Sequence, residues 1–337
     1  MTTLYKRLKS VALRFARLTT ITLLWFLSCS INAQSLGPGA RPVGADWSRS
    51  PVYGAQGMAA TAQPLASQIA IDILKQGGSA VDAAIAANAA LGLMEPTGNG
   101  IGGDLFAIVW DPKTQQLYGY NGSGRSPVGR DLDALLSAIE AMKSGGQLPK
   151  DYRGIPSHGS LAVTVPGTVD GWFALHERWG ALDMDEVLAP AAEYAEIGFP
   201  MSPVIAAAFA ANQRRFEQRE SMIEELDNAR ALYFPEGVAP AVGTMFRNPD
   251  LAKTLRILGA EGRASFYQGR LAEQMADYFE AIDADLTAAD LANHVGEWVE
   301  PRGVDYHGAT LWELPPNGQG FAALMMLNII TMQQLLV

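Results

Sequence analysis

The stretch ATAQPLASQIAIDILKQGGSAVDAAIAANAALGLMEPTGNGIGGDLFAIVWD, residues 60–111, sets out the first elements of the fold. Pro64 is a favourable first residue for a helix, and apolar residues follow it at helical spacing until a Gly-Gly pair at 77–78. Ser79 and Asp82 then form a capping-box pattern at the start of a second helix. Because this second helix is rich in alanine, the two helices are predicted to pack closely.

A glycine-rich loop and a hairpin are expected next. Residues 98–103 (GNGIGG) match the spacing G-x-G-x-x-G, but they follow a helix and precede the strand LFAIVW at 105–110. Dinucleotide-binding proteins have the reverse order, so nucleotide binding is not predicted. The glycines are interpreted as a tight turn or a close approach of two backbones, where a Cβ would clash. The strand is expected to be buried and to pair with QQLYGYN, 115–121.

The remainder of the chain alternates short strands with helices. LAVTV at 161–165 predicts a strand, and VDGWFALHERWG at 169–180 predicts a helix. Residues 185–295 are mostly helical in pattern, with prolines at the breaks. VDYHGATLWEL at 304–314 indicates a strand or hairpin, and 320–336 an apolar helix. The order of elements indicates an α+β fold.

The first thirty-three residues have the three parts of a secretory signal peptide. Five basic residues and no acid precede an apolar run at 18–31, and Ile31-Asn32-Ala33 is a suitable cleavage site. Residues 34–56, rich in Gly, Pro and Ser, are interpreted as a leader or linker. The chain is therefore expected to be periplasmic or secreted.

Two other interpretations of the apolar run fit less well. As a helix it extends about 21 Å, short of the ~30 Å hydrocarbon core of a membrane. A lipid anchor on Cys29 normally has a small aliphatic residue where this sequence has Phe26. Removal of residues 1–33 leaves 20 basic and 35 acidic residues, a net charge of −15, and no cysteine. These values are typical of an acidic exported protein.

Composition excludes several functional classes for this chain of 337 residues. Its single cysteine excludes a disulfide framework and a cysteine-rich metal site. The net charge of −10 argues against nucleic-acid binding, which requires a basic surface. No zinc site is expected, since the histidines show no paired spacing: they are His158, His176, His294 and His307.

Taken together, these segments resemble the gamma-glutamyltransferase family. The most specific part is the run PLAS…ILKQGGSAVDAA…EP…GIGG within residues 60–111. Further matches are SLAVTVPGTVDG at 160–171, Asp290-Leu291, and LPPNGQG at 314–320 before a helix. The resemblance runs in unbroken order over roughly residues 54–334.

The resemblance implies an N-terminal-nucleophile hydrolase with a four-layer αββα sandwich. Such precursors cut themselves into a large and a small subunit, which exposes a threonine whose own α-amine is the general base. That threonine attacks a γ-glutamyl amide such as glutathione, and the resulting ester passes to water or to an amino acid or peptide. No cofactor is implied.

The resemblance also implies that the nucleophile belongs to a small subunit beyond the Pro315-Pro316 loop. No threonine here stands in the family's cleavage motif, so no catalytic residue is assigned in this chain. Residues 57–337 are interpreted as a C-terminally truncated large-subunit region, with the small-subunit half of the sandwich absent. Apolar faces and strand edges are then expected to be unpaired, and the chain alone inactive and poorly stable.

Arg125 is the one candidate substrate-binding residue. Typical members of the family carry Arg-Glu-x-x-Pro after the hairpin, and the Arg forks onto the substrate α-carboxylate. In Asn121–Pro127 (NGSGRSP), Ser123 stands at the usual arginine position and Arg125 two residues later, similar to the gamma-glutamyltransferase-like branch. Three interpretations stay open. Arg125 takes over the contact with the substrate carboxylate, the protein accepts a different acyl group, or Arg125 only forms an ion pair at the surface.

Three functions stay open at this level. The favoured one is a gamma-glutamyl transferase or hydrolase; the others are a related acylase for glutaryl or other acyl groups and a non-catalytic exported protein. The loop 317–320 is expected either to line the site or to serve turn geometry alone. The expected partners are a γ-glutamyl small molecule and the small subunit of the same precursor, without nucleic acid or a permanent membrane span.

Overall fold

The computed structural model describes residues 52–334 of the chain. The predicted signal peptide (1–33) and most of the predicted leader (34–56) lie outside this range, so both stay predictions. Within it, no helix combines the length and the apolar character that crossing a membrane requires.

The predicted helix pair is confirmed as α2 (Pro64–Lys75) and α3 (Ala80–Met94). The capping box is formed as predicted: the Asp82 backbone N–H donates to Ser79 Oγ at 3.0 Å, and the Ser79 N–H donates to Asp82 Oδ2 at 2.8 Å. The small side chains of α3 let its neighbours α2 and α6 (Met184–Ile197) approach closely, which builds the centre of the apolar core. α9 (Pro249–Glu261) also packs against α6.

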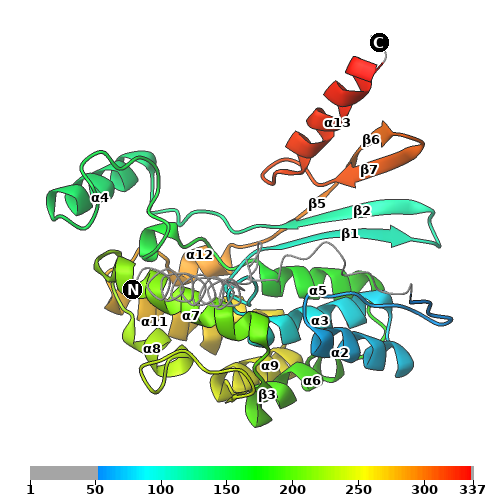
Figure 1. Cartoon of the computed structure of the whole chain (residues 1–337), viewed down its shortest axis with the longest axis horizontal. Coiled ribbons are helices and arrows are strands. Elements are labelled where there is room, and N and C mark those ends of the chain that lie inside the picture. Colours follow the sequence, from blue (N-terminus) through cyan, green and yellow to red (C-terminus); the bar gives the residue numbers. More distant parts are fainter. Residues whose placement is uncertain (1–51, 335–337) are drawn as a thin grey trace, which may run out of the picture. The chain divides into compact units, whose positions relative to one another are not determined.

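Helices supply most of the regular structure after the first hairpin (Figure 1). The breaks predicted near three prolines are confirmed, since Pro200 and Pro235 lie outside helices and Pro249 begins one, whereas Pro190 lies inside α6. The remaining helices are α4 (Leu132–Ser144), α5 (Thr168–Trp179), α7 (Pro203–Arg219), α8 (Asp227–Tyr233), α9 (Pro249–Glu261), α10 (Arg263–Tyr267), α11 (Arg270–Ala281), α12 (Ala288–Ala292) and α13 (Gly320–Gln334), with 3₁₀ turns at Ser160–Ala162 and Glu220–Met222.

A three-stranded antiparallel sheet has the order β1-β2-β5. β1 (Leu105–Asp111) and β2 (Gln116–Gly122) form the predicted hairpin, and β5 (Glu297–Val299) adds to β2 with Glu297 opposite Asn121. α5 packs against β1 and β2, so helices cover one face of this sheet (Figure 1).

The expectation that residues 105–110 form a buried strand is only half right. β1 alternates between partly buried and exposed residues, as a strand does when one face alone is covered. Phe106, Ile108 and Trp110 are 48%, 41% and 53% exposed on the outer face. The sequence is apolar on both faces, which is typical of a strand with layers on both sides.

The strand predicted at 161–165 is wrong. Residues 160–162 form a 3₁₀ turn and the following residues are extended without a paired strand. The reason is Arg130, whose guanidinium donates to the carbonyls of Ser160, Leu161 and Val163 at 3.0–3.1 Å. One buried side chain thus satisfies acceptors that a neighbouring strand otherwise satisfies.

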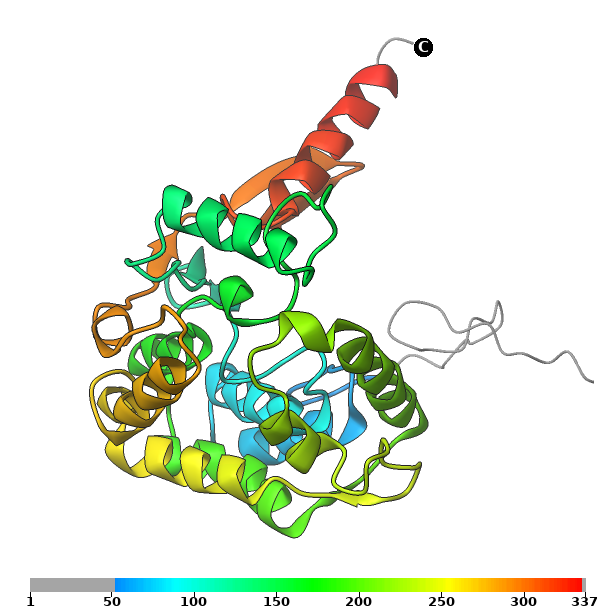
Figure 2. The ribbon, with the colours of Figure 1, turned by 90° about the vertical axis from the view of Figure 1, so that its left-hand side faces the viewer.

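The C-terminal part of the described residues contains the predicted hairpin and the predicted helix. β6 (Arg302–Tyr306) pairs with β7 (Ala309–Glu313), and α13 packs against both (Figure 2). A further short pair, β3 (Phe199–Pro200) with β4 (Met245–Phe246), lies between the larger helices.

Candidate functional site

Polar side chains gather where β2 ends. Asn121 is on β2, Ser123 follows it, and Asn317 comes from the loop between β7 and α13. Asn121 Nδ2 donates to Asn317 Oδ1 at 3.1 Å, and Asn317 Nδ2 donates to Ser123 Oγ at 2.6 Å. The loop residue that the sequence singled out therefore lies beside the position where typical family members have arginine.

Arg125, the predicted substrate-binding residue, lies at the edge of this cluster. Its Nη2 donates to Glu297 Oε1 at 2.6 Å, and the two side chains are 72% and 56% exposed. An exposed ion pair of this kind contributes about 0–1 kcal/mol. The guanidinium is therefore paired but accessible to a ligand carboxylate.

The backbone that carries Arg125 is held on both sides. The Gly124 N–H donates to Asp104 Oδ1 at 2.8 Å, and the Arg125 carbonyl accepts from the Val165 N–H at 3.0 Å. A Cβ on Gly124 would lie 1.8 Å from the Val165 carbonyl oxygen, so this position requires glycine. A loop held by these backbone contacts thus presents an exposed guanidinium.

A buried ionic network lies beneath the end of β2. Asp170, on α5, accepts from the Tyr120 hydroxyl at 2.5 Å, from Arg263 Nε at 2.5 Å and from the Gly296 N–H at 2.8 Å. Burial acts to raise the pKa of Asp170, but these hydrogen bonds and the Arg263 charge outweigh it and hold the pKa below its usual value. The network fixes Gly296 and so aims the next residue, Glu297, at Arg125.

His294 is a buried histidine next to the same network. Its ring stacks on Tyr267 with 5.4 Å between centroids, and Arg263 donates to its carbonyl oxygen. Neither ring nitrogen has a hydrogen-bond partner among the described residues. Burial is the main cause that lowers the pKa of His294, so the ring is neutral at pH 7.

A cavity of about 290 Å³ adjoins the polar cluster. It lies between the outer face of β1 and the loop that follows β7, and it shares Asn317 with the cluster. Phe106, Ile108 and Leu314 give it an apolar side, while Asn317, Gln319 and the acidic Glu313 give it a polar one. Such a lining suits a ligand with a short methylene chain and a polar end.

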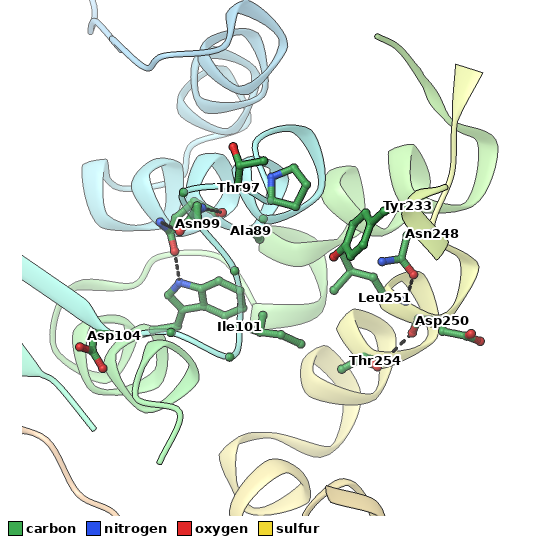
Figure 3. Close-up of a pocket in the computed structure, with 18 residues that line it drawn as sticks. Ala89, Thr97, Asn99, Ile101, Asp104, Tyr233, Asn248, Asp250, Leu251 and Thr254 are labelled. Atoms are coloured by element: carbon green, nitrogen blue, oxygen red, sulfur yellow. Dashed lines mark hydrogen bonds between the residues drawn. The ribbon is translucent and has the colours of Figure 1, made fainter. Parts of the chain in front are cut away.

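A larger cavity, of about 630 Å³, is bordered by the glycine-rich loop (Figure 3). Tyr233 of α8, Asn248 at the start of α9 and Leu251 of α9 form its opposite wall. Trp172 also lines the cavity. Asp104 lines its edge and also accepts the Gly124 N–H, so the cavity begins next to the Arg125 loop.

The glycine-rich loop turns tightly, as one of its two interpretations predicted: the Gly98 N–H donates to the Glu95 carbonyl at 3.0 Å and the Gly103 N–H to the Gly100 carbonyl at 3.2 Å. The other interpretation, a close approach of two backbones at these glycines, is wrong. A Cβ at Gly98, Gly100 or Gly102 would meet no atom within 4 Å, and none of these residues has positive φ. The close approach occurs instead between Gly122 and Gly167, where a Cβ on Gly167 would lie 1.9 Å from the Gly122 carbonyl oxygen. The loop does precede a strand, as the sequence order indicated.

The sequence profile described as Gamma-glutamyltranspeptidase matches residues 66–335. This chain belongs to the gamma-glutamyltranspeptidase family. Its fold is accordingly the α+β architecture of the N-terminal-nucleophile hydrolases, to whose solved members it is similar.

Three similar proteins illustrate the range of the gamma-glutamyltranspeptidase family. The glutathione hydrolase-like YwrD proenzyme of Bacillus subtilis is 36% identical and matches 83% of this chain and 49% of its own length. The oxamate amidohydrolase proenzyme of Klebsiella pneumoniae is 34% identical and matches 81% of this chain and 49% of its own length. A cephalosporin acylase structure from Bacillus halodurans is similar with 40% identity and a TM-score of 0.73, and the match covers 86% of this chain and 52% of that one. The chain therefore spans about half the length of these relatives.

Arg125, Ser123 and Asn317 were singled out from the sequence and lie close together, but the residues that hold them were not identified. Glu297 has no motif of its own, and only the pairing of β5 with β2 brings it to Arg125. Asp170 lay within the quoted match at 160–171 without an assigned role. No group of three His, Cys, Asp or Glu side chains within residues 52–334 is arranged to hold a metal ion.

Proposed function

We propose that this chain forms the large-subunit part of an exported gamma-glutamyl transferase or hydrolase that cleaves gamma-glutamyl amides such as glutathione. The supporting observation is the accessible Arg125 guanidinium on a rigid loop, beside the neutral polar groups of Asn121, Ser123 and Asn317. A guanidinium fork suits an α-carboxylate, and the adjoining 290 Å³ cavity suits the methylene chain of a glutamyl group.

The nucleophile in this proposal is the N-terminal threonine of a small subunit from the same precursor. Its hydroxyl attacks the γ-carbonyl carbon while its α-amine accepts the hydroxyl proton and passes it to the departing amine. The C–N bond breaks, a γ-glutamyl ester remains, and water or an acceptor amine then takes the acyl group. The small subunit would also cover the outer face of β1.

The proposal places the mature protein in the periplasm or outside the cell. Residues 1–33 serve as a cleavable signal, 34–56 as a leader, and 57–337 as the large-subunit region. Fractionation of expressing cells, with N-terminal sequencing of the exported product, tests this: a start at Gln34 supports it, and an uncleaved chain in the cytoplasm contradicts it.

The chain alone is expected to be inactive, because the threonine and its amine are supplied by the small subunit. Purified chain should release no product above background from a chromogenic γ-glutamyl anilide, and measurable turnover would refute the proposal. The DNA after codon 337 gives a second test. A continuation that encodes a threonine-led subunit supports the enzyme, whereas unrelated sequence supports a non-catalytic exported protein.

Arg125 is tested in the chain assembled with a threonine-led small subunit. Arg125→Gln should raise KM roughly 10- to 100-fold with little change in kcat, because the variant loses a charge-assisted contact with the substrate carboxylate. Arg125→Lys should recover part of the loss, because the charge remains without the fork. Arg270→Gln, which removes an exposed arginine paired with Glu261 on another helix, is the control.

An acylase for glutaryl or related acyl groups is the second candidate. It is supported by Ser123 at the usual arginine position and by the similarity to a cephalosporin acylase. The assembled enzyme should be compared on glutaryl and γ-glutamyl anilides. A higher kcat/KM for the glutaryl compound favours the acylase.

A further inference from the structure

We infer that a cavity between α7, α8 and the segment around His158 binds an aromatic monocarboxylate, a single ring that carries a short acid side chain. The cavity measures about 240 Å³, and five rings and one arginine line most of it: His158, Phe209, Phe216, Tyr233, Phe234 and Arg215. None of these residues belongs to the polar cluster at the end of β2. The inference therefore goes beyond the proposed function and does not depend on it.

Aromatic side chains form the walls of this aromatic cavity. The Phe209 and Tyr233 rings lie 5.8 Å apart between centroids. The Phe216 ring packs against His158 at 6.1 Å and against Phe234 at 6.4 Å. Phe209 and Phe234 are buried in the fold, whereas the other three rings are half-buried and present surface to the cavity. Aromatic rings pack well on a further ring, edge to face or offset, so these walls suit a flat ring.

The volume of the aromatic cavity favours a small ligand. Pockets for drug-sized molecules measure about 300–1,000 Å³, so a cavity of about 240 Å³ suits one ring with a short side chain. Thr97 and Tyr233 line both this cavity and the larger one beside the glycine-rich loop (Figure 3). A longer side chain would extend into that larger cavity.

An arginine without a carboxylate partner gives the aromatic cavity its charge. Arg215 Nη1 donates to Asn212 Oδ1 at 3.0 Å, and within residues 52–334 Arg215 forms no salt bridge. Glu217, the next acid along α7, accepts from Gln213 Nε2 at 3.0 Å instead. A guanidinium has five N–H groups, so a fork remains for a ligand carboxylate.

A second arginine makes the surroundings of the aromatic cavity positive. Arg219, one turn after Arg215, donates to Ser157 Oγ at 2.6 Å. Burial is the main cause that lowers the pKa of His158, and the charges of Arg219 and Arg215 lower it further. The His158 ring is therefore neutral at pH 7, and the positive charge comes from the arginines. Such a field favours an acid over an amine.

Ligand-observed NMR titration of the full chain with phenylacetate and with phenylacetamide tests this. Phenylacetate should bind saturably and more tightly than phenylacetamide, which has the ring without the charge. Arg215→Gln should weaken phenylacetate about 5- to 10-fold, because a partly exposed charge-assisted contact is lost, and leave phenylacetamide within about twofold. Arg214→Gln is the matched control: it removes the adjacent exposed arginine, which is not part of the cavity lining, and should change neither affinity.

A variant of the wall tests the contribution of the rings. Phe216→Leu keeps an apolar side chain on α7 and should weaken both compounds about 2- to 10-fold, because a ring–ring contact is lost. Unchanged affinity for both compounds in this variant would show that they bind elsewhere and would overturn the inference.

The remaining outcomes are equally decisive. Absence of saturable binding to the unaltered chain overturns the inference, and so does a phenylacetate affinity that Arg215→Gln leaves unchanged or that Arg214→Gln lowers equally. An equal loss of both compounds in Arg215→Gln also overturns it, because the charge is then not what the arginine supplies. Arg125→Gln should leave phenylacetate binding unchanged; if it removes the binding, the compound occupies the Arg125 site instead. The proposed function is unaffected by failure here, since its tests involve none of the residues of the aromatic cavity.

Discussion

Individual glycines near the site differ in what they do, although the sequence makes them look alike. Gly124 is packed against the Val165 carbonyl oxygen, where an added Cβ would lie at 1.8 Å, whereas Gly102 faces open space. Gly124→Ala should therefore destabilise the chain by about 1–3 kcal/mol or more, and Gly102→Ala by about 0.5 kcal/mol or less. Urea unfolding of both variants measures the difference. Equal losses would show that the Gly124 loop relaxes without cost.

His294 should make the chain less stable in mild acid. Its pKa is lowered in the folded state, chiefly by burial, so the unfolded chain binds more protons below about pH 6.5. The contribution of the neutral His294 ring to the free energy of unfolding is therefore fully present above that pH and is lost as the pH falls. The charged or titratable groups around the ring are Asp104, Tyr120, Arg125, Asp170, Arg263 and Tyr267.

The variant His294→Phe tests this contribution, because it fills the space with a ring that cannot charge. Its free energy of unfolding should fall less than that of the parent chain as the pH is lowered through the range below about pH 6.5. A parallel pH profile for His294→Phe and the parent would contradict the assignment.

At the scale of residues, the sequence singled out only positions that a local motif identifies. Arg125 and Ser123 were found by counting from Pro127, and Asn317 by its place in a family loop. Glu297 could not be found this way, because its role depends on a strand pairing made across most of the chain.

Among the elements, α3 illustrates how a predicted local motif acquires a tertiary role. The capping box of Ser79 and Asp82 was evident from sequence, but the same Asp82 carboxylate also accepts from the Ala181 N–H at 2.9 Å and the Leu182 N–H at 3.3 Å. Ser79→Ala should lower the free energy of unfolding by about 1 kcal/mol, because α3 loses its N-terminal cap. Asp82→Ala should cost about 3 kcal/mol or more, since it leaves buried N–H groups unpaired at two element ends.

Thermal or urea unfolding of the two α3 variants gives the comparison. Asp133→Ala on α4, an exposed acid one residue into its helix, serves as the control and should cost about 0.5 kcal/mol or less. Similar losses in Ser79→Ala and Asp82→Ala would mean that the contacts to Ala181 and Leu182 contribute nothing.

The elements that sequence predicted well have self-contained signals. α2, α3 and α9 have caps or initial prolines, and the β1–β2 hairpin has a turn at its centre. Residues 161–165 had only apolar β-branched content, and Arg130 satisfied their carbonyls instead of a strand. Propensity was correct about extended backbone only at 163–165, since 161 and 162 belong to a 3₁₀ turn, and it could not identify the partner.

For the whole molecule, the dominant feature is an uncovered apolar face. Phe106, Ile108 and Trp110 project from β1, and several apolar side chains of α13 are exposed as well. Contiguous apolar surface of this kind marks an interaction site or an association hazard. The sequence anticipated it from the family architecture, and the alternating burial of β1 agrees with that expectation.

The exposed apolar face of β1 should drive self-association of the chain. The full chain should bind a hydrophobic dye and self-associate as its concentration rises, because exposed apolar strand surface is available on every copy. Replacing Phe106 and Ile108 together with Glu should lower both dye fluorescence and the associated fraction several-fold. Val242→Glu changes an equally exposed apolar residue in a separate loop and should have little effect. Sedimentation velocity and dye titration measure the two quantities on the same samples. If the double variant associates as strongly as the parent chain, the β1 face is not the surface that drives association.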